Sequence, residues 1–154
     1  MFTVFFLLAV SVASAFVVHF TTKPKDADYF VATDAILRWE YSSRETIKYV
    51  KFGVQSGKDD VAIIVKDVSA KTVQFNSLVR PEVTASFIGR VSAVKDELAS
   101  FKIKNLTLND TGRYFCSLDP GKESVSVAEY VELTVVGKYY TGHSSASVSW
   151  FCFP

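Results

Sequence analysis

The sequence predicts an all-β sandwich of about nine strands in two antiparallel sheets. Short segments that alternate apolar and polar residues recur along the chain, turn-forming residues separate them, and no segment has the apolar period of a helix longer than one turn. The chain has 154 residues, which suits one domain, and its 13 phenylalanines and 7 tyrosines can fill a substantial core.

Alternation places the strands of the first half. Leu37, Trp39 and Tyr41 alternate with Arg38 and Glu40, so the first three side chains share one buried face. Tight-turn residues at 42–45 and a hairpin loop at 56–60 separate the later strands. We therefore expect strands at 29–33, 35–41, 47–54, 61–66 and 71–75, with Val50, Phe52 and Val54 facing inward.

The second half follows the same pattern. Phe101 and Ile103 face inward from one strand, and Leu106 plugs the core from the corner at 105–110. Pro120 and Gly121 mark a β-turn before the last strand. We expect strands at 89–91, 98–104, 112–118 and 126–136, with Val131, Leu133 and Val135 facing inward.

The most specific motif is D-x-G-x-Y-x-C, which covers Asp110, Gly112, Tyr114 and Cys116. With the apolar residues that precede it, the full pattern is Phe101, Ile103, Leu106, Asp110, Gly112, Tyr114 and Cys116. On this pattern the chain resembles the V-set family of immunoglobulin domains over about 29–136. The two short strands at 61–66 and 71–75 correspond to the extra pair that distinguishes the V-type sandwich.

The resemblance implies roles for individual residues. The hydroxyl of Tyr114 would bind back to the backbone at the preceding turn, forming a tyrosine corner, and Gly112 would permit that tight turn. Arg90 would pair with Asp110 at one end of the sandwich.

The cysteine content departs from the family. Members normally carry a disulfide between the sheets, with a tryptophan packed against it, but this chain has only Cys116 and Cys152. Trp39 stands at the first cysteine position and Phe52 at the tryptophan position. We expect the Trp39 indole to fill the vacated volume and Cys116 to be a buried free thiol.

Two alternatives remain for the cysteines. A bridge between Cys116 and Cys152 would require the tail to thread between the sheets. Otherwise Cys152 either links to another chain or has no role.

Four segments are expected along the chain. Residues 1–15 read as a cleaved secretory signal peptide, because an apolar run ends in the small residues Ala13, Ser14 and Ala15; the alternative is an uncleaved membrane anchor. An N-terminal segment at 16–27, the immunoglobulin-like domain at 28–136 and a polar and aromatic tail at 137–154 follow. No later segment is long enough to span a membrane, so we expect a protein that is secreted or lies on the extracellular face of the plasma membrane.

Catalysis is not expected. His19 lies in the N-terminal segment and His143 in the tail, and no cluster has the spacing of a catalytic set or of metal ligands. The net charge of +1 disfavours nucleic-acid binding. We predict neither an enzyme nor a cofactor, a small-molecule substrate or a nucleic-acid partner.

Protein recognition is the predicted function. If Phe52, Cys116 and Leu133 face inward, their neighbours form an outer face with three aromatic rings, which is typical of an interface. The candidates are Tyr49, Lys51, Phe115, Ser117, Tyr130 and Glu132. V-set domains pair through this sheet, so the resemblance implies a protein partner, either a copy of the chain or another immunoglobulin-like domain.

The sequence leaves two biological roles open, a receptor and a soluble ligand. The loss of both the disulfide and the core tryptophan is similar to divergent invertebrate self-recognition or adhesion receptors, which favours cell adhesion or immune recognition. The alternative is a soluble immune effector or decoy ligand. Asn105 and Asn109 each begin an Asn-x-Thr sequon and are predicted glycosylation sites of a secreted glycoprotein.

Overall fold

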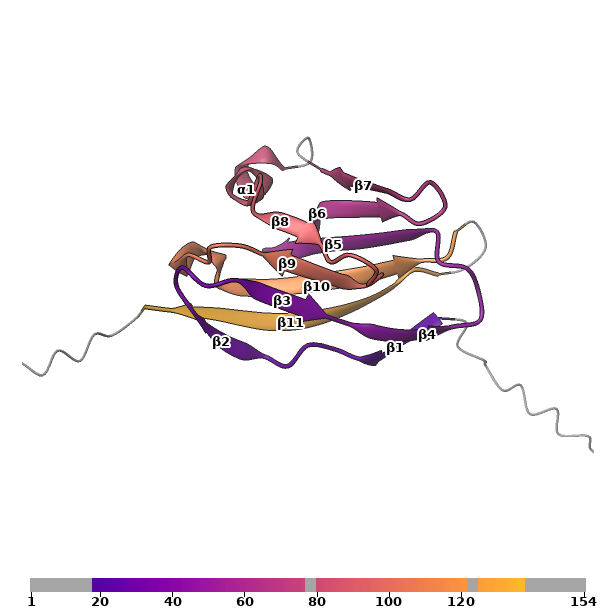
Figure 1. Cartoon of the computed structure of the whole chain (residues 1–154), viewed down its shortest axis with the longest axis horizontal. Helices are drawn as coiled ribbons and strands as arrows, with labels where there is room; N and C mark the ends of the chain where they lie inside the picture. The colour runs from indigo at the N-terminus through magenta and orange to yellow at the C-terminus, as the bar shows by residue number, and fades with distance from the viewer. Residues whose placement is uncertain (1–17, 77–79, 122–124, 138–154) are drawn as a thin grey trace, which may run out of the picture.

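The computed structural model describes residues 18–76, 80–121 and 125–137. Figure 1 shows two layers of strands packed face to face, with one short helix at a corner. The described ranges contain the strands β1 (Val18–Thr22), β2 (Ala27–Phe30), β3 (Ala35–Arg38), β4 (Glu40–Ser43), β5 (Tyr49–Ser56), β6 (Asp59–Asp67), β7 (Thr72–Phe75), β8 (Val91–Ala93), β9 (Ser100–Ile103), β10 (Gly112–Asp119) and β11 (Val127–Val136). The helix α1 (Pro81–Thr84) and the 3-10 turns η1 (Ala85–Phe87) and η2 (Leu108–Asp110) complete the elements.

The larger layer, called the front sheet below, has six strands in the order β2-β11-β10-β5-β6-β7. All neighbours are antiparallel except β2, which runs parallel to β11. The expectation of two purely antiparallel sheets is therefore wrong at this edge. After β1 has paired with β4 on the other layer, the chain crosses over and reaches the front sheet running in the direction of β11.

The second layer, the back sheet, has the order β3-β9-β8. Strand β4 follows β3 with only Trp39 between them, and it leaves β9 to pair with β1. Among the described residues, β1 already pairs with β4 from Val18 onward, so the sandwich includes residues that precede the expected domain start at residue 28. The predicted signal peptide, most of the tail and Cys152 lie outside the described residues. In the part of the chain that is described, no helix is long and apolar enough to cross a membrane.

Aromatic rings join the two layers. Phe52 of β5 stacks on Phe101 of β9 with ring centroids 4.6 Å apart, and on Tyr114 of β10 at 5.9 Å. The edge of the Trp39 indole meets Phe52 at 6.1 Å. All four side chains are at most 3% exposed, so the predicted inward faces of these strands are confirmed.

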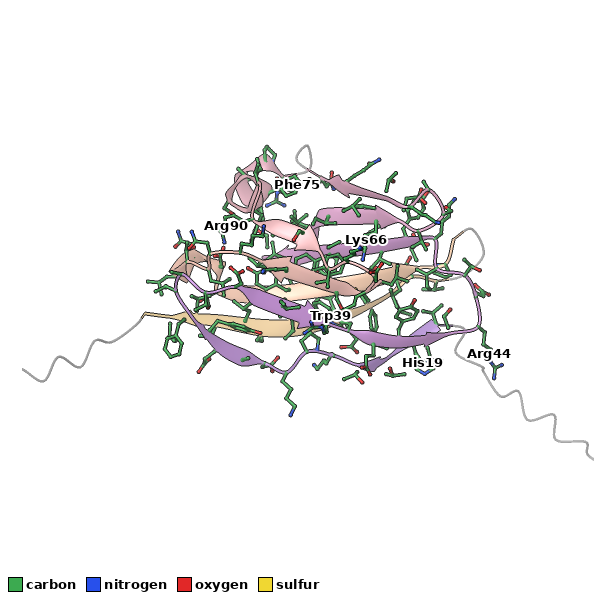
Figure 2. All side chains as sticks on the ribbon, in the orientation of Figure 1. His19, Trp39, Arg44, Lys66, Phe75 and Arg90 are labelled. Atoms are coloured by element: carbon green, nitrogen blue, oxygen red, sulfur yellow. The ribbon has the colours of Figure 1, made fainter. Side chains whose placement is uncertain are left out.

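Trp39, between β3 and β4 (Figure 2), occupies the core as expected, but its indole N–H has no hydrogen-bond partner among the described residues. Cys116 is fully buried and forms no disulfide with any described residue, as the free-thiol interpretation predicts. Burial raises the pKa of its thiol, which makes it an inert packing group. Sulfur and indole together fill the space between the layers without a covalent link.

The corner before β10 matches the implied geometry. The Tyr114 hydroxyl donates to the carbonyl oxygen of Asp110 at 2.8 Å. The Asp110 carboxylate, 2% exposed, accepts from Arg90 Nη2 at 2.5 Å and from the backbone N–H of Thr107 at 2.7 Å. The tyrosine corner and the Arg90–Asp110 ion pair are therefore confirmed, and Leu106 beside them is 1% exposed.

Gly112 does not have the predicted role. Its φ is not positive, and an added Cβ would meet only Val54 Cγ2 at 3.8 Å, an ordinary contact. The turn is held instead by η2, where Thr107 and Asp110 bond reciprocally as a capping box. The motif glycine is therefore not required for the backbone conformation.

Trp39→Ala should lower the free energy of unfolding by about 3–5 kcal/mol, because it leaves a cavity between the layers. Trp39→Phe should cost clearly less, since it keeps a ring and removes the unpaired N–H. Urea denaturation of both variants measures the difference. An alanine variant as stable as the wild type would mean that Trp39 does not fill the core.

Stability should fall at alkaline pH. The pKa values of Cys116 and Tyr114 are raised by burial, so both stay protonated in the folded state where the unfolded chain ionises. The stability from the thiol is complete below about pH 9 and is lost as the pH rises above that value, by up to about 1.4 kcal/mol per pH unit. Urea unfolding of the wild type and of Cys116→Ala near pH 7, 9 and 10 should show a weaker dependence in the variant; equal dependence would contradict the assignment.

Candidate functional site

The candidate site is the outer surface of β11, β10, β5 and β6, called the front face below. Along β10, Tyr114, Cys116 and Leu118 belong to the core, so the alternate side chains point outward. Strand register aligns them with outward residues of the neighbouring strands. The front face comprises Tyr49, Lys51, Gly53, Gln55, Asp60, Ala62, Arg113, Phe115, Ser117, Tyr130 and Glu132.

Phe115 lies on this face but is not part of an exposed patch. Its side chain is only 3% exposed. In the register it stands between Tyr130 and Gly53, and a Cβ added to Gly53 would come within 2.6 Å of Phe115 Cε1. The phenyl ring therefore lies down over the glycine, and the expectation that it projects into solvent is wrong.

The side chain of Tyr130 packs over the ring of Phe115. The two rings are tilted with centroids 6.2 Å apart, and the Tyr130 hydroxyl donates to Asp60 Oδ2 at 2.7 Å. Tyr130 belongs to β11 and Asp60 to β6, so this side chain reaches across β10 and β5. The hydrogen bond to the Asp60 carboxylate raises the pKa of Tyr130.

Arg113 also contacts the Tyr130 ring. Its guanidinium carbon lies 4.4 Å from the centroid of the Tyr130 ring, and Nη1 donates to Gln55 Oε1 at 3.2 Å. Arg113 also lies 3.6 Å from Glu132. Sequence reasoning missed Arg113, Gln55 and Asp60, because the contacts join side chains from different strands.

The rest of the front face, around Tyr49, Lys51 and Ser117, has fewer contacts between its side chains. Tyr49 is partly exposed, with Lys48 Nζ 5.2 Å from its ring centroid, and Lys51 Nζ lies 3.9 Å from Asp119 Oδ2. Ser117 lies opposite Lys51 in the register and is partly exposed. Five of the six sequence candidates thus reach solvent, namely Tyr49, Lys51, Ser117, Tyr130 and Glu132.

Both sequons lie off the front face, in the connection between β9 and β10. Asn105 and Asn109 are exposed, whereas the middle residues Leu106 and Asp110 are 1% and 2% exposed. A glycan on either asparagine would leave the front face uncovered.

The front face offers groups for binding a folded surface. It combines aromatic rings, a stacked guanidinium, one ammonium group and two carboxylates, which belong to Asp60 and Glu132. Among the described residues, no three His, Cys, Asp or Glu side chains gather as a metal site.

Comparison with solved structures identifies the fold. Murine CRIg aligns with a TM-score of 0.60 and 21% identity, over 77% of this chain and 98% of that chain. The IgV-like domain of human B7-H4 aligns with a TM-score of 0.55 and 15% identity, over 79% and 96%. A marsupial T cell receptor aligns with a TM-score of 0.58 and 15% identity, over 77% of this chain and 53% of that chain.

These likenesses show the fold, a divergent V-type immunoglobulin sandwich. No family model matches the chain, and no curated protein matches it in sequence.

Gly53→Ala should disturb the front face. The new Cβ would lie 2.0 Å from the Val61 carbonyl oxygen and 2.6 Å from Phe115 Cε1, so backbone and ring must both shift. We expect a loss of about 1–3 kcal/mol in unfolding free energy, typical of overpacking. Gly112→Ala, in the adjacent strand, is the matched control and should be nearly neutral. Urea denaturation of both variants tests this, and equal stability would contradict the packing described.

Proposed function

We propose that this chain is an extracellular recognition domain that binds a protein partner through the front face. The observation that carries the proposal is the fixed arrangement of Tyr130, Arg113 and Asp60 over a buried Phe115. Tyrosine and arginine are enriched among residues that dominate binding energy. Groups that are already ordered lose less conformational entropy on binding.

The partly exposed residues around this arrangement complete the proposed contact surface. Tyr49 adds a second amphipathic ring, Ser117 is a small partly exposed side chain, and Lys51 and Glu132 supply charges. Aromatic rings and an arginine within a polar rim agree with the composition of protein interfaces.

The structural neighbours support recognition as the general role. They include a B7-H4 IgV-like domain and a T cell receptor, the second of which is named as a receptor. By this analogy we propose a role in cell adhesion or self and immune recognition, with a copy of this chain or another immunoglobulin-like domain as partner. The apolar start of the chain supports secretion or display at the cell surface, and the exposed Asn105 and Asn109 are the proposed glycosylation sites.

Ser117→Arg tests the front face without disturbing its supports. Ser117 makes no side-chain hydrogen bond in the described structure, so an added guanidinium should stay in solvent and block close approach. We expect binding to fall at least roughly thirtyfold, corresponding to about 2 kcal/mol. Fluorescent beads coated with the domain would be scored for bead–bead aggregation and for attachment to cells of the source organism.

Ile36→Arg is the control, because Ile36 lies on the outer face of β3 in the back sheet and is 37% exposed. It should leave aggregation and attachment unchanged. If Ser117→Arg folds normally and binds like the wild type while Ile36→Arg does not, the proposed face is the wrong one.

A further inference from the structure

The inner face of the front sheet extends further than the back sheet that covers it. The front sheet ends at β7 after six strands, whereas the back sheet ends at β8 after three. Val73 of β7 lies opposite Lys66 in the register, and Lys66 points toward the back layer, where its ammonium group donates to Leu98 O at 2.6 Å. Val73 therefore faces inward, yet it is 53% exposed, because the described part of the back sheet ends at β8.

This uncovered surface forms one wall of a groove. The groove runs between β7 with the β6–β7 turn on one side and β8 with the β8–β9 turn on the other, and it has a volume of about 520 Å³. Its apolar lining includes Val68, Val73, Ala93 and Leu98. An extended segment placed here would bury Val73 and continue the back sheet by one strand.

Strand β8 presents an unpaired edge beside the groove. On the side of β9, Val94 N–H donates to Ser100 O at 2.9 Å. Residues that bond to a given neighbour alternate along an antiparallel strand, so the N–H and C=O groups of Ala93 point away from β9. Ala93 also lines the groove, and within the described ranges no strand pairs with this edge.

The lining of the groove has no net charge that would select a charged segment. Its three lysines are matched by three acidic residues, namely Lys66, Lys71 and Lys95 with Asp67, Asp96 and Glu97. Burying a charge without a partner is unfavourable, so the segment that fits is uncharged and apolar on the side that meets Val68 and Val73. Pairing with β8 further favours aromatic and β-branched residues.

The chain itself contains a segment of this kind. Residues 144–154 carry no charged side chain, and 147–153 read Ser-Val-Ser-Trp-Phe-Cys-Phe. Val148 and Trp150 alternate with Ser147 and Ser149, so an extended backbone places the two apolar side chains on one face. Residues 147–153, called the tail segment below, follow β11 in sequence and lie outside the described residues.

The start of the tail segment is far from the groove of its own chain. Val73 is level with the beginning of β11, since the register leads from it through Lys66, Val50 and Leu118 to Val127. The end of β11 at Val136 lies at the opposite end of the sheet (Figure 1), nine residues or roughly 30 Å away along the strand and four strand spacings or roughly 19 Å across it.

These distances favour the groove of a second copy. The twelve residues from Val136 to Val148 extend to roughly 40 Å. The direct line through the protein is already roughly 35 Å, so no slack remains for a path around the edge of β7. The tail segment of a neighbouring molecule is under no such restraint.

The edge of a second copy's sheet does not fit in place of a single segment. Strand β8 packs against β6 of the other layer, so β7 extends beyond the edge of β8. Two copies that paired β8 with β8 would be related by a twofold axis perpendicular to the sheets, and their β7 strands would collide in the front layer. Only one extended segment can occupy the position.

We propose that the tail segment of one copy occupies the groove of a second copy as an added strand of its back sheet. The backbone of the segment pairs with Ala93, and Val148 and Trp150 pack on Val73 and Val68. Strand addition takes its affinity from main-chain hydrogen bonds and its specificity from alternate side chains. The contact joins two different surfaces head to tail, and it does not involve the front face.

Sedimentation velocity of the full mature chain over a wide concentration range tests the proposal. Every protein carries Cys152→Ala, so that no disulfide can link two tails. Ala93→Pro removes the N–H donor of the groove and leaves the β8–β9 ladder intact, and Trp150→Asp places a charge in the apolar floor. Each should weaken association at least roughly thirtyfold. Phe151→Asp, on the opposite face of the segment, is the matched control and should weaken it far less.

Mixing the two defective variants separates this contact from any other. Ala93→Pro keeps an intact tail segment and Trp150→Asp keeps an intact groove, so an equimolar mixture should form one-to-one pairs although neither variant associates alone. Ser117→Arg, which alters the front face, should leave this association unchanged. Val73→Asp is a second groove variant at an exposed position, and it replaces Ala93→Pro if that variant does not fold.

Three results would overturn the proposal. The first is a chain that stays monomeric up to millimolar concentration, including one whose Ala93 amide resonance is shifted by Trp150→Asp, because the segment would then lie in the groove of its own chain. The second is a folded groove variant that associates like the wild type. The third is a mixture that does not restore pairing, or an association that Ser117→Arg abolishes.

Discussion

The stacking of Phe52 on Phe101 is the contact on which the rest of the structure depends. It joins β5 of the front sheet to β9 of the back sheet with ring centroids 4.6 Å apart, in the core region where immunoglobulin domains commonly carry a disulfide between the sheets. A bridge of that kind contributes about 2–4 kcal/mol, and a buried tryptophan contributes a similar amount. The buried ring of Trp39, packed edge-on against Phe52, therefore offsets the stabilisation that a disulfide at this position would have contributed.

The same stack determines the shape of the front face. Tyr114 continues the stack from Phe52, so β10 is fixed from inside, while Phe115, the next residue, is held from outside between Gly53 and Tyr130. Because side chains pack against both of its faces, β10 has little freedom to twist. The hydroxyl of Tyr130 can then reach Asp60 across two intervening strands, and the polar network of the face follows from core packing.

Much of this arrangement is predictable from the sequence. Alternation identifies the inward side chains of β3, β5, β9, β10 and β11, and the motif around Tyr114 predicts the corner and its ion pair. The prediction that the Phe115 side chain is exposed was wrong, and the reason is informative. Alternation tells which way a side chain points but not whether a neighbour covers it, and the cover comes from Tyr130 and the space from Gly53. A glycine within an apolar strand was the available signal.

Strands β1 and β2 and the side-chain contacts across the front face were harder to predict, for a different reason. Strands β1 and β2 are short and belong to different layers, so neither shows a long alternating pattern. The contacts of Arg113 with Gln55 and of Tyr130 with Asp60 depend on register between strands that are distant in sequence. Only a three-dimensional arrangement brings such groups together.

The packing of Cys116 bears on how the domain acquires its structure. The sulfur of Cys116 is a packing atom without a covalent partner among the described residues, so the part of the sandwich that the structure describes is held together without a disulfide. The layers come together by burial of aromatic and aliphatic side chains, and burial raises the pKa of the enclosed thiol. The folded domain should consequently keep its packing in the presence of thiol reductants, because no bond between the described sheets is open to reduction.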